Sequence, residues 1–283
     1  MTYKFVAVLC AAVLAVGCKP EPKPPAAAPP VITEAVAPLQ LTIHAKDFAF
    51  TAPDTVPSGV TTITLINDGP GIHHVQLMKL DSGHTAAELG VALKKKGPPP
   101  AWAHFASGPN VPMAGAQATA TLDLAPGSYA IVCLVDYPDH VPHFAKGMMH
   151  GLVVTPSTAP GAVLGHASYT ITATEYAFAV SDTIKAGIRT FDVKMGGTQP
   201  HEVSLFMLLP GMTMKDVMKW GTTYKGAPPV QLLGGVTAAD SGMTVRFTAD
   251  LMPGNYVMLC FVPDAKDGKP HMVHGMVKEF TVN

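Results

Sequence analysis

The 283-residue sequence contains one pattern twice. Residues 40–155 and 168–283 align with little adjustment, and their shared segments follow the same order. A Pro-Gly-x-Tyr segment that ends at Cys133 recurs and ends at Cys260. Each copy is long enough to bury a core of its own, so the repeat predicts two copies of one domain.

Each copy has the pattern of short strands with one helical insertion. Residues 61–66, 117–124 and 129–133 alternate in polarity between Gly, Pro and Asp turns, which is typical of a β-sandwich. A capping box at residues 85–88 predicts a short helix that ends near position 95. The corresponding Thr-Met-Lys-Asp at 213–216 is a weaker version of the same signal.

These patterns predict an all-β chain of two tandem Greek-key β-sandwich domains, at residues 39–156 and 166–283. The 26 glycines and 27 prolines suit many strands joined by turns. Charged residues are few and the formal net charge is −1, so the composition gives no indication of nucleic-acid binding.

Residues 1–17 are interpreted as a lipoprotein signal peptide. The apolar run from position 5 to 16 follows Lys4 and is shorter than the roughly 20 residues that span a membrane. It ends in Leu-Ala-Val-Gly-Cys, which resembles a bacterial lipobox, so Cys18 is the expected lipidation site. An ordinary secretory signal is the alternative. The Pro/Ala-rich residues 18–38 are expected to form an extended tether.

The N-terminus therefore predicts a lipid-anchored protein on the periplasmic side of the cell envelope. Lys19 stands where an Asp favours inner-membrane retention in known lipoproteins, so the outer membrane is expected if the cell is Gram-negative. The membrane is expected to be contacted only through the lipid.

Strand alternation selects one histidine in each copy. Residues two apart share a face, so His73 points with Val75 to the apolar side and His74 points away. The second copy has His201 at the apolar position and Glu202 in place of His74. Each cysteine ends an inward-facing apolar strand and is followed by a loop with His and Met.

One thiolate, two imidazoles and a thioether form the His₂Cys site with a weak axial Met that copper uses for electron transfer. The expected metal ligands of the first copy are His73, Cys133, His143 and Met148. Those of the second copy are His201, Cys260, His271 and Met276. The expected cofactor is copper, one ion per domain and two per chain.

The strand His and the late Cys–loop–His–x₄–Met resemble the cupredoxins, and the loops are similar to those of the type 1 site of copper nitrite reductases. Nine residues separate Cys133 from His143, and ten separate Cys260 from His271. The resemblance implies a plastocyanin-like fold and blue copper sites. Asn67 resembles the Asn that locks the loop before the first cupredoxin His, but Met195 occupies its place in the second copy.

The same resemblance raises the possibility of an enzyme, which the residues argue against. Two-domain copper enzymes have a His directly before the Cys, where this chain has Val132 and Leu259. His-x-His pairs for a trinuclear cluster are also missing from the sequence. A disulfide between Cys133 and Cys260 is not expected, because each should be buried in its own domain.

The expected function is one-electron transfer with a transient redox-protein partner, and the oligomeric state is left open. The resemblance to the cupredoxins implies that His143 and His271 reach apolar surface patches and act as electron portals. A copper carrier, buffer or chaperone is the alternative, and a sensory or adhesion module is a weaker one. Further His and Met residues near the sites favour copper handling, although they also suit ordinary loops: His74, His104, His140, Met149, His150, Met272 and His274.

Overall fold

The computed structural model describes residues 1–2, 36–95, 97–159 and 161–283. Cys18, almost all of the predicted signal peptide and most of the predicted tether lie outside the described residues, so lipidation stays a prediction. Among the described residues, no helix is both long and apolar enough to cross a bilayer.

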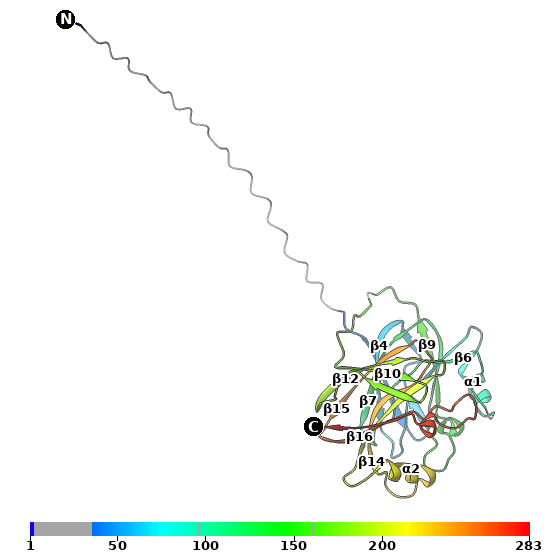
Figure 1. Ribbon diagram of the computed structural model, residues 1–283. Coiled ribbons are helices and arrows are strands. Elements are labelled where there is room, and N and C mark those ends of the chain that lie inside the picture. Colours follow the sequence, from blue (N-terminus) through cyan, green and yellow to red (C-terminus); the bar gives the residue numbers. More distant parts are fainter. Residues whose placement is uncertain (3–35, 96, 160) are drawn as a thin grey trace. The chain divides into compact units, whose positions relative to one another are not determined.

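The first half of the chain forms two sheets around a shared core (Figure 1). Burial alternates along their strands, with Leu41, Ile43 and Ala45 facing inward from the first strand. One sheet has the order β2 (Ala49–Thr51), β1 (Leu39–Lys46), β4 (Gly59–Asn67) and β7 (Gln117–Leu124). The other has the order β3 (Thr55–Pro57), β9 (Met149–Thr155), β8 (Gly127–Val132), β5 (Gln76–Leu80) and β6 (Ala103–Phe105).

The second half forms the same kind of sandwich. One sheet has the order β11 (Ala177–Val180), β10 (Tyr169–Thr174), β12 (Gly187–Met195) and β15 (Thr244–Leu251). The other has the order β14 (Val230–Ala239), β13 (His201–Leu208), β16 (Gly254–Leu259) and β17 (Val277–Val282). The predicted all-β fold with two tandem β-sandwiches is confirmed.

One helix is inserted into each sandwich, as the capping boxes predict. Helix α1 (Ala86–Leu93) has Thr85 as its N-cap, and Glu88 closes the capping box. Helix α2 (Met214–Thr223) begins after Thr213, and Asp216 closes its box despite the shorter side chain. Both boxes satisfy backbone N–H groups that a helix start would otherwise leave unpaired.

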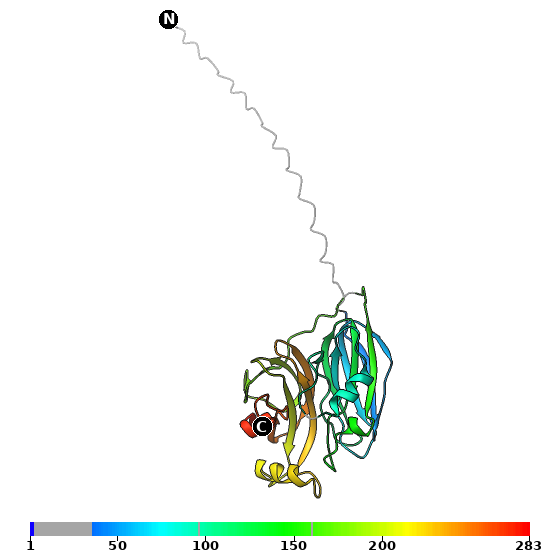
Figure 2. The same cartoon turned by 90° about the vertical axis from the view of Figure 1, so that its right-hand side faces the viewer.

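The two sandwiches lie side by side and share hydrogen bonds (Figure 2). Strand β7 of the first half pairs with β15 of the second, so that one eight-stranded sheet runs through both. The segment 106–112 pairs with β14 through three isolated bridges. Side chains reinforce this pairing, because Gln76 donates to the carbonyl of Ala238 at 2.8 Å and Asn110 donates to Ser204 Oγ at 2.9 Å.

Two glycines in equivalent places let the interface segments approach the backbone of their own halves closely. A Cβ on Gly108 would lie 2.2 Å from the carbonyl oxygen of Val75, and one on Gly235 would lie 2.0 Å from that of Val203. Both residues also have positive φ, at 151° and 108°. Only glycine combines this backbone conformation with so close an approach.

Candidate metal centres

A loop between β4 and β5 places His73. Asn67 ends β4, donates from Nδ2 to the carbonyl of Gly71 at 2.8 Å and accepts the N–H of Gly69 at 3.2 Å. These bonds hold the loop that precedes His73, which lies just before β5 and is fully buried. Asn67 therefore locks the loop before His73, as the resemblance implies.

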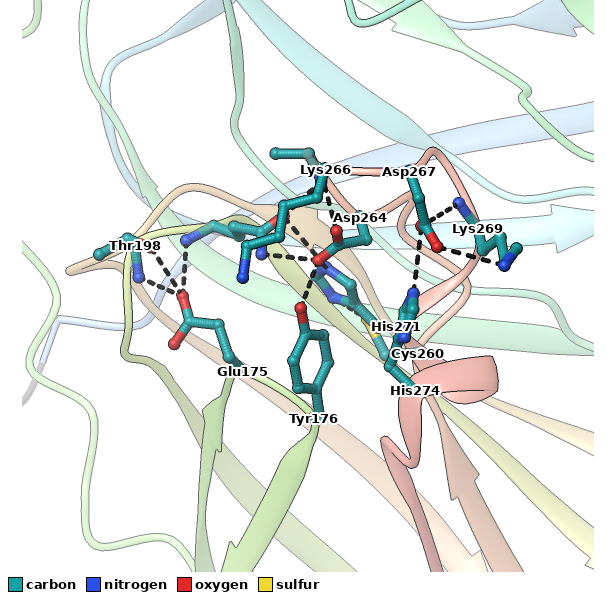
Figure 3. Close-up of polar contacts among 12 residues, drawn as sticks. Glu175, Tyr176, Thr198, Cys260, Asp264, Lys266, Asp267, Lys269, His271 and His274 are labelled. Carbon is teal, nitrogen blue, oxygen red and sulfur yellow. Dashed lines mark hydrogen bonds and ion pairs between the residues drawn. The ribbon is translucent and has the colours of Figure 1, made fainter.

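The corresponding loop of the second half is held by a different residue. Oε1 of Glu175 accepts hydrogen bonds from the Thr198 backbone, the Thr198 hydroxyl and the N–H of Gln199 (Figure 3). This carboxylate fixes the loop before His201, which is fully buried and begins β13. The second loop is thus anchored although Met195 replaces the asparagine.

Both cysteine loops use the same backbone hydrogen bonds. In the first loop, Phe144 donates to Cys133 at 2.9 Å and Met148 donates to His143 at 3.0 Å. In the second loop, Met272 donates to Cys260 at 2.9 Å and Met276 donates to His271 at 3.0 Å. His143 also donates to Val135 at 2.8 Å and His271 to Val262 at 2.9 Å, so the one-residue difference in length lies between these paired residues.

A short 3-10 helix and a glycine bring each methionine back toward its cysteine. Helix η1 (His143–Lys146) ends at Gly147 with φ 107°, and η2 (His271–His274) ends at Gly275 with φ 103°. This left-handed turn favours glycine. Met148 and Met276 follow directly, and both are fully buried in the same apolar cluster as the two cysteines.

Three predicted ligands converge in the first site. The Nδ1 atoms of His73 and His143 lie 3.1 Å apart, and Sγ of Cys133 lies 3.5 Å from Nδ1 of His143. All three side chains are buried. Donor atoms at these separations suit one shared ion at metal–nitrogen and metal–sulfur distances of about 2.0–2.3 Å.

The second site has the same arrangement. Sγ of Cys260 lies 3.5 Å from Nδ1 of His271, and the rings of His201 and His271 have centroids 5.1 Å apart. Both ring nitrogens of His201 are buried and have no hydrogen-bond partner. Such orphaned nitrogens are costly unless something binds them, so a metal ion fits this site.

Burial sets the protonation of these groups in the metal-free protein. It raises the pKa of the Cys133 thiol to about 12 and also raises the pKa of Cys260. Burial, together with the neighbouring imidazole, lowers the pKa of His201 to about 4, and the pKa of His73 is lowered by the same causes. The imidazoles are therefore neutral at pH 7, whereas the thiols must lose a proton to bind a metal.

The donor set fits copper. A thiolate and two imidazoles also bind zinc, but the predicted fourth ligand of each site is a methionine thioether, a soft ligand of the kind used at copper electron-transfer centres. The two cysteines are free thiols, so no disulfide competes for them.

His74 lies outside the group of metal donors, in agreement with the selection of His73 from the repeat, and it has a structural role. Its Nε2 accepts the N–H of Leu134 at 2.8 Å, directly after the cysteine. Glu202 does the same in the second half, where its Oε1 accepts the N–H of Phe261 at 2.8 Å. Burial raises the pKa of Glu202 to about 7. Both residues fix the start of the cysteine loop and point away from the metal donors.

The expectation of solvent-exposed histidine edges is wrong for the described structure. His143 is 1 % exposed and its Nε2 lies 2.7 Å from the carbonyl of Tyr137. His271 is fully buried, with Nε2 3.3 Å from Oε1 of Gln199. The loop residues around each histidine, and not the imidazoles, form the surface.

Helix α2 of the second half covers the cysteine loop of the first half. Trp220 stacks on Tyr137 with centroids 5.6 Å apart, and Tyr224 stacks on His140 at 4.7 Å. The Tyr224 hydroxyl donates to Asp136 at 2.7 Å. The first site is therefore enclosed by its partner domain.

The other histidines near the sites have local partners. His104 bonds to Asp81 at 3.0 Å, and His274 bonds to Asp267 at 3.1 Å. Within the described part of the chain, one further group could hold a metal, namely Asp264, Asp267 and His274. Asp264 already accepts hydrogen bonds from Tyr176, Gln199 and the backbone of Lys266 (Figure 3).

Copper proteins are among the solved structures to which the chain is similar. No family model and no curated protein matches the chain. Reduced auracyanin from Roseiflexus castenholzii is 26% identical over 43% of this chain and 100% of its own, with a TM-score of 0.28. Auracyanin A, a "blue" copper protein from Chloroflexus aurantiacus, is 24% identical over 42% of this chain and all of its own, with a TM-score of 0.30.

A copper nitrite reductase from Nitrosomonas europaea is 13% identical and covers 87% of this chain and 94% of its own, with a TM-score of 0.27. The two His-Cys-His groups fit type 1 copper sites.

Three residues that support the sites were not anticipated from the sequence. Asp47 contacts His73, Glu175 holds the loop before His201, and Gln199 faces His271. The alignment of the repeat contains a signal for two of them, because Asp47 and Glu175 are carboxylates at equivalent positions.

Proposed function

We propose that the protein is a copper-binding electron carrier with one type 1 site in each sandwich. The observation that carries this proposal is the duplicated convergence of two buried imidazoles on a buried cysteine, with a buried methionine next in the loop. The proposed ligands are His73, Cys133, His143 and Met148 in the first site, and His201, Cys260, His271 and Met276 in the second.

Copper in such a site cycles between the cuprous and cupric states and so exchanges one electron. The residues of this chain keep the donors in place during the exchange. Backbone hydrogen bonds fix both cysteine loops, and Asn67 and Glu175 fix the loops before the first histidines. Fixed donors limit rearrangement between the two states, which favours fast electron transfer.

The proposed carrier has no catalytic role of its own. Val132 and Leu259 precede the two cysteines and offer no ligand for a second copper centre. A weak and transient redox-protein partner is proposed to supply and remove electrons. The lipobox-like segment ending at Cys18 supports attachment to the periplasmic side of the envelope.

A copper carrier without an electron-transfer role is the competing function, and redox cycling separates the two. Copper-loaded protein is reduced with ascorbate and reoxidised with ferricyanide over repeated cycles in the presence of a cuprous chelator, bathocuproine disulfonate. An electron carrier recovers its visible band and retains its copper. Progressive loss of copper to the chelator at each reduction would instead indicate a copper carrier.

A further inference from the structure

The two sites differ in the groups that hold their first histidines. In the first site, Oδ1 of Asp47 lies 2.5 Å from Nε2 of His73, whose side chain is fully buried. In the second site, Glu175 occupies the position equivalent to Asp47 but is one methylene longer. Its Oε1 reaches the backbone of Gln199, and His201 has no partner on either ring nitrogen.

The second histidine of each site, in the loop after the cysteine, is also held more tightly in the first site than in the second. His143 donates from Nε2 to the carbonyl of Tyr137 over 2.7 Å, whereas His271 meets the amide oxygen of Gln199 over 3.3 Å. In the first site, the Nε2 atoms of both histidines, which face away from the cysteine, thus have short hydrogen bonds. In the second site, Nε2 of one histidine has no partner and Nε2 of the other has a longer contact.

A carboxylate that accepts the outer N–H of a ligating imidazole orients the ring and makes it a stronger donor. The stronger donor stabilises the more highly charged cupric state more than the cuprous state. Relying on the copper-binding function proposed above, we propose that Asp47 is a positioning residue that gives the first site a lower reduction potential than the second.

Other charges near the sites act more weakly. Asp264 is buried, but its carboxylate lies 3.8 Å from Nε2 of His271, which is beyond hydrogen-bond distance, and it already accepts three hydrogen bonds. Lys146 lies near the first site, but it is paired with Asp139 at 2.8 Å. Glu202 is buried beside the second site, but its Oε1 accepts the N–H of Phe261 rather than that of a ligand imidazole. The proposal assigns the larger effect to Asp47, because its carboxylate contacts His73 directly.

This order of potentials determines where a single electron resides in the half-reduced protein. If both sites held copper, the single electron of the half-reduced protein would reside mainly at the second site, and the first site would remain mainly cupric. Enclosure of the first site by α2 excludes water and by itself favours the less charged cuprous state, so it opposes the effect of Asp47, which the proposal takes to be the larger of the two.

The test compares single-site variants that are loaded with Cu²⁺ and titrated by visible spectroelectrochemistry. Cys260→Ser retains the first site and Cys133→Ser retains the second. We expect a lower midpoint potential for Cys260→Ser, by at least the 59 mV that corresponds to a tenfold preference for a one-electron couple. Equal potentials, or the reverse order, would overturn the proposal.

Asp47→Asn is then added to both backgrounds, with a copper count for each variant. We expect it to raise the midpoint of the first site and to leave that of the second unchanged, because Asn lacks the negative charge. A shift in both sites, or in neither, contradicts the role of Asp47. If Asp47→Asn releases copper from the first site, the midpoint potentials of Cys260→Ser and Cys133→Ser still decide whether the first site has the lower potential.

Absence of a visible band in both Cys260→Ser and Cys133→Ser would refute the type 1 sites themselves. This outcome is distinct from a failure of the proposal for Asp47.

Discussion

At the residue scale, the two copies of the repeat have carboxylates at equivalent positions, and the difference of one methylene in side-chain length changes their hydrogen-bond partners. Asp47 is short enough to reach His73, whereas Glu175 extends past His201 to Thr198 and Gln199. The loop that Glu175 holds is held in the first half by Asn67. The two sites thus share their donors and differ in their supporting hydrogen bonds.

We predict that the two loop anchors act locally. Asn67→Ala removes two hydrogen bonds in a buried place, so it should lower the free energy of unfolding by about 1–3 kcal/mol and weaken copper binding at the first site. Glu175→Ala should weaken binding at the second site only. Urea unfolding and copper titration of each variant measure both effects. Equal losses at both sites in either variant would show that the anchors are not local.

Copper binding to the metal-free protein should release one proton per site at pH 7. Burial raises the pKa of the Cys133 thiol to about 12 and raises that of Cys260, so both thiols are protonated before copper binds. The buried His201, with its pKa lowered to about 4, has no proton to lose at this pH. Apparent affinity should therefore rise about tenfold per site for each pH unit between 7 and 9.

Proton release is measured in weakly buffered solution with an indicator dye, and zinc serves as a second metal. Cys133→Ser should release one proton fewer per chain than the parent protein. A release of two protons per site would mean that the histidines are charged in the metal-free protein, contrary to the burial of their side chains.

At the scale of elements, local sequence patterns predict the strands and helices, but they do not predict which surface each element packs against. The capping boxes predict both helices, and the repeat predicts equivalent cysteine loops. The sequence does not predict that α2 packs across the loop of the other half, because Trp220 and Tyr224 look like ordinary amphipathic helix residues. Such contacts depend on domain packing, which a single-sequence pattern does not encode.

Trp220→Ala should open the first site without affecting the second. Loss of the stacking on Tyr137 should cost about 1–3 kcal/mol of stability and increase the rate at which ascorbate reduces the first copper several-fold. Stopped-flow reduction in the Cys260→Ser and Cys133→Ser backgrounds separates the two sites. Met218→Ala, a half-exposed position on the same helix, is the matched control and should change neither rate.

At the scale of the whole molecule, the two sandwiches pair through equivalent elements. Ala120 and Phe247 occupy equivalent positions of the two copies and pair with each other across β7 and β15. The segment 106–112 likewise pairs with its own counterpart in β14. This arrangement gives the two halves an approximate two-fold relation, like that of a symmetric dimer.

Because one sheet runs through both halves, we predict that the metal-free protein unfolds in a single cooperative transition. Differential scanning calorimetry should give one peak, with a calorimetric enthalpy equal to the van't Hoff enthalpy. Two resolved peaks would show that the halves are independent and that the shared sheet contributes little to stability.

The repeat made most of the site predictable from the sequence. It selected His73 over His74, because the second copy retains only the inward-facing histidine, and the structure shows His74 bonded to the backbone of Leu134. The shared sheet and the burial of His143 were not predictable, because polar residues such as Gln76 and Asn110 form the interface and carry no distinctive pattern. The exposed histidine edges were expected from the resemblance alone.

The central claim is that each half of the chain holds one type 1 copper. The most direct measurement is reconstitution of the metal-free protein with Cu²⁺, with a metal count per chain and a visible spectrum. We predict two coppers per chain and an intense thiolate-to-copper band, of which Cys133→Ser and Cys260→Ser each remove about half together with one copper. A fully loaded protein without that band, or a band that survives both substitutions, would contradict the assignment of type 1 sites.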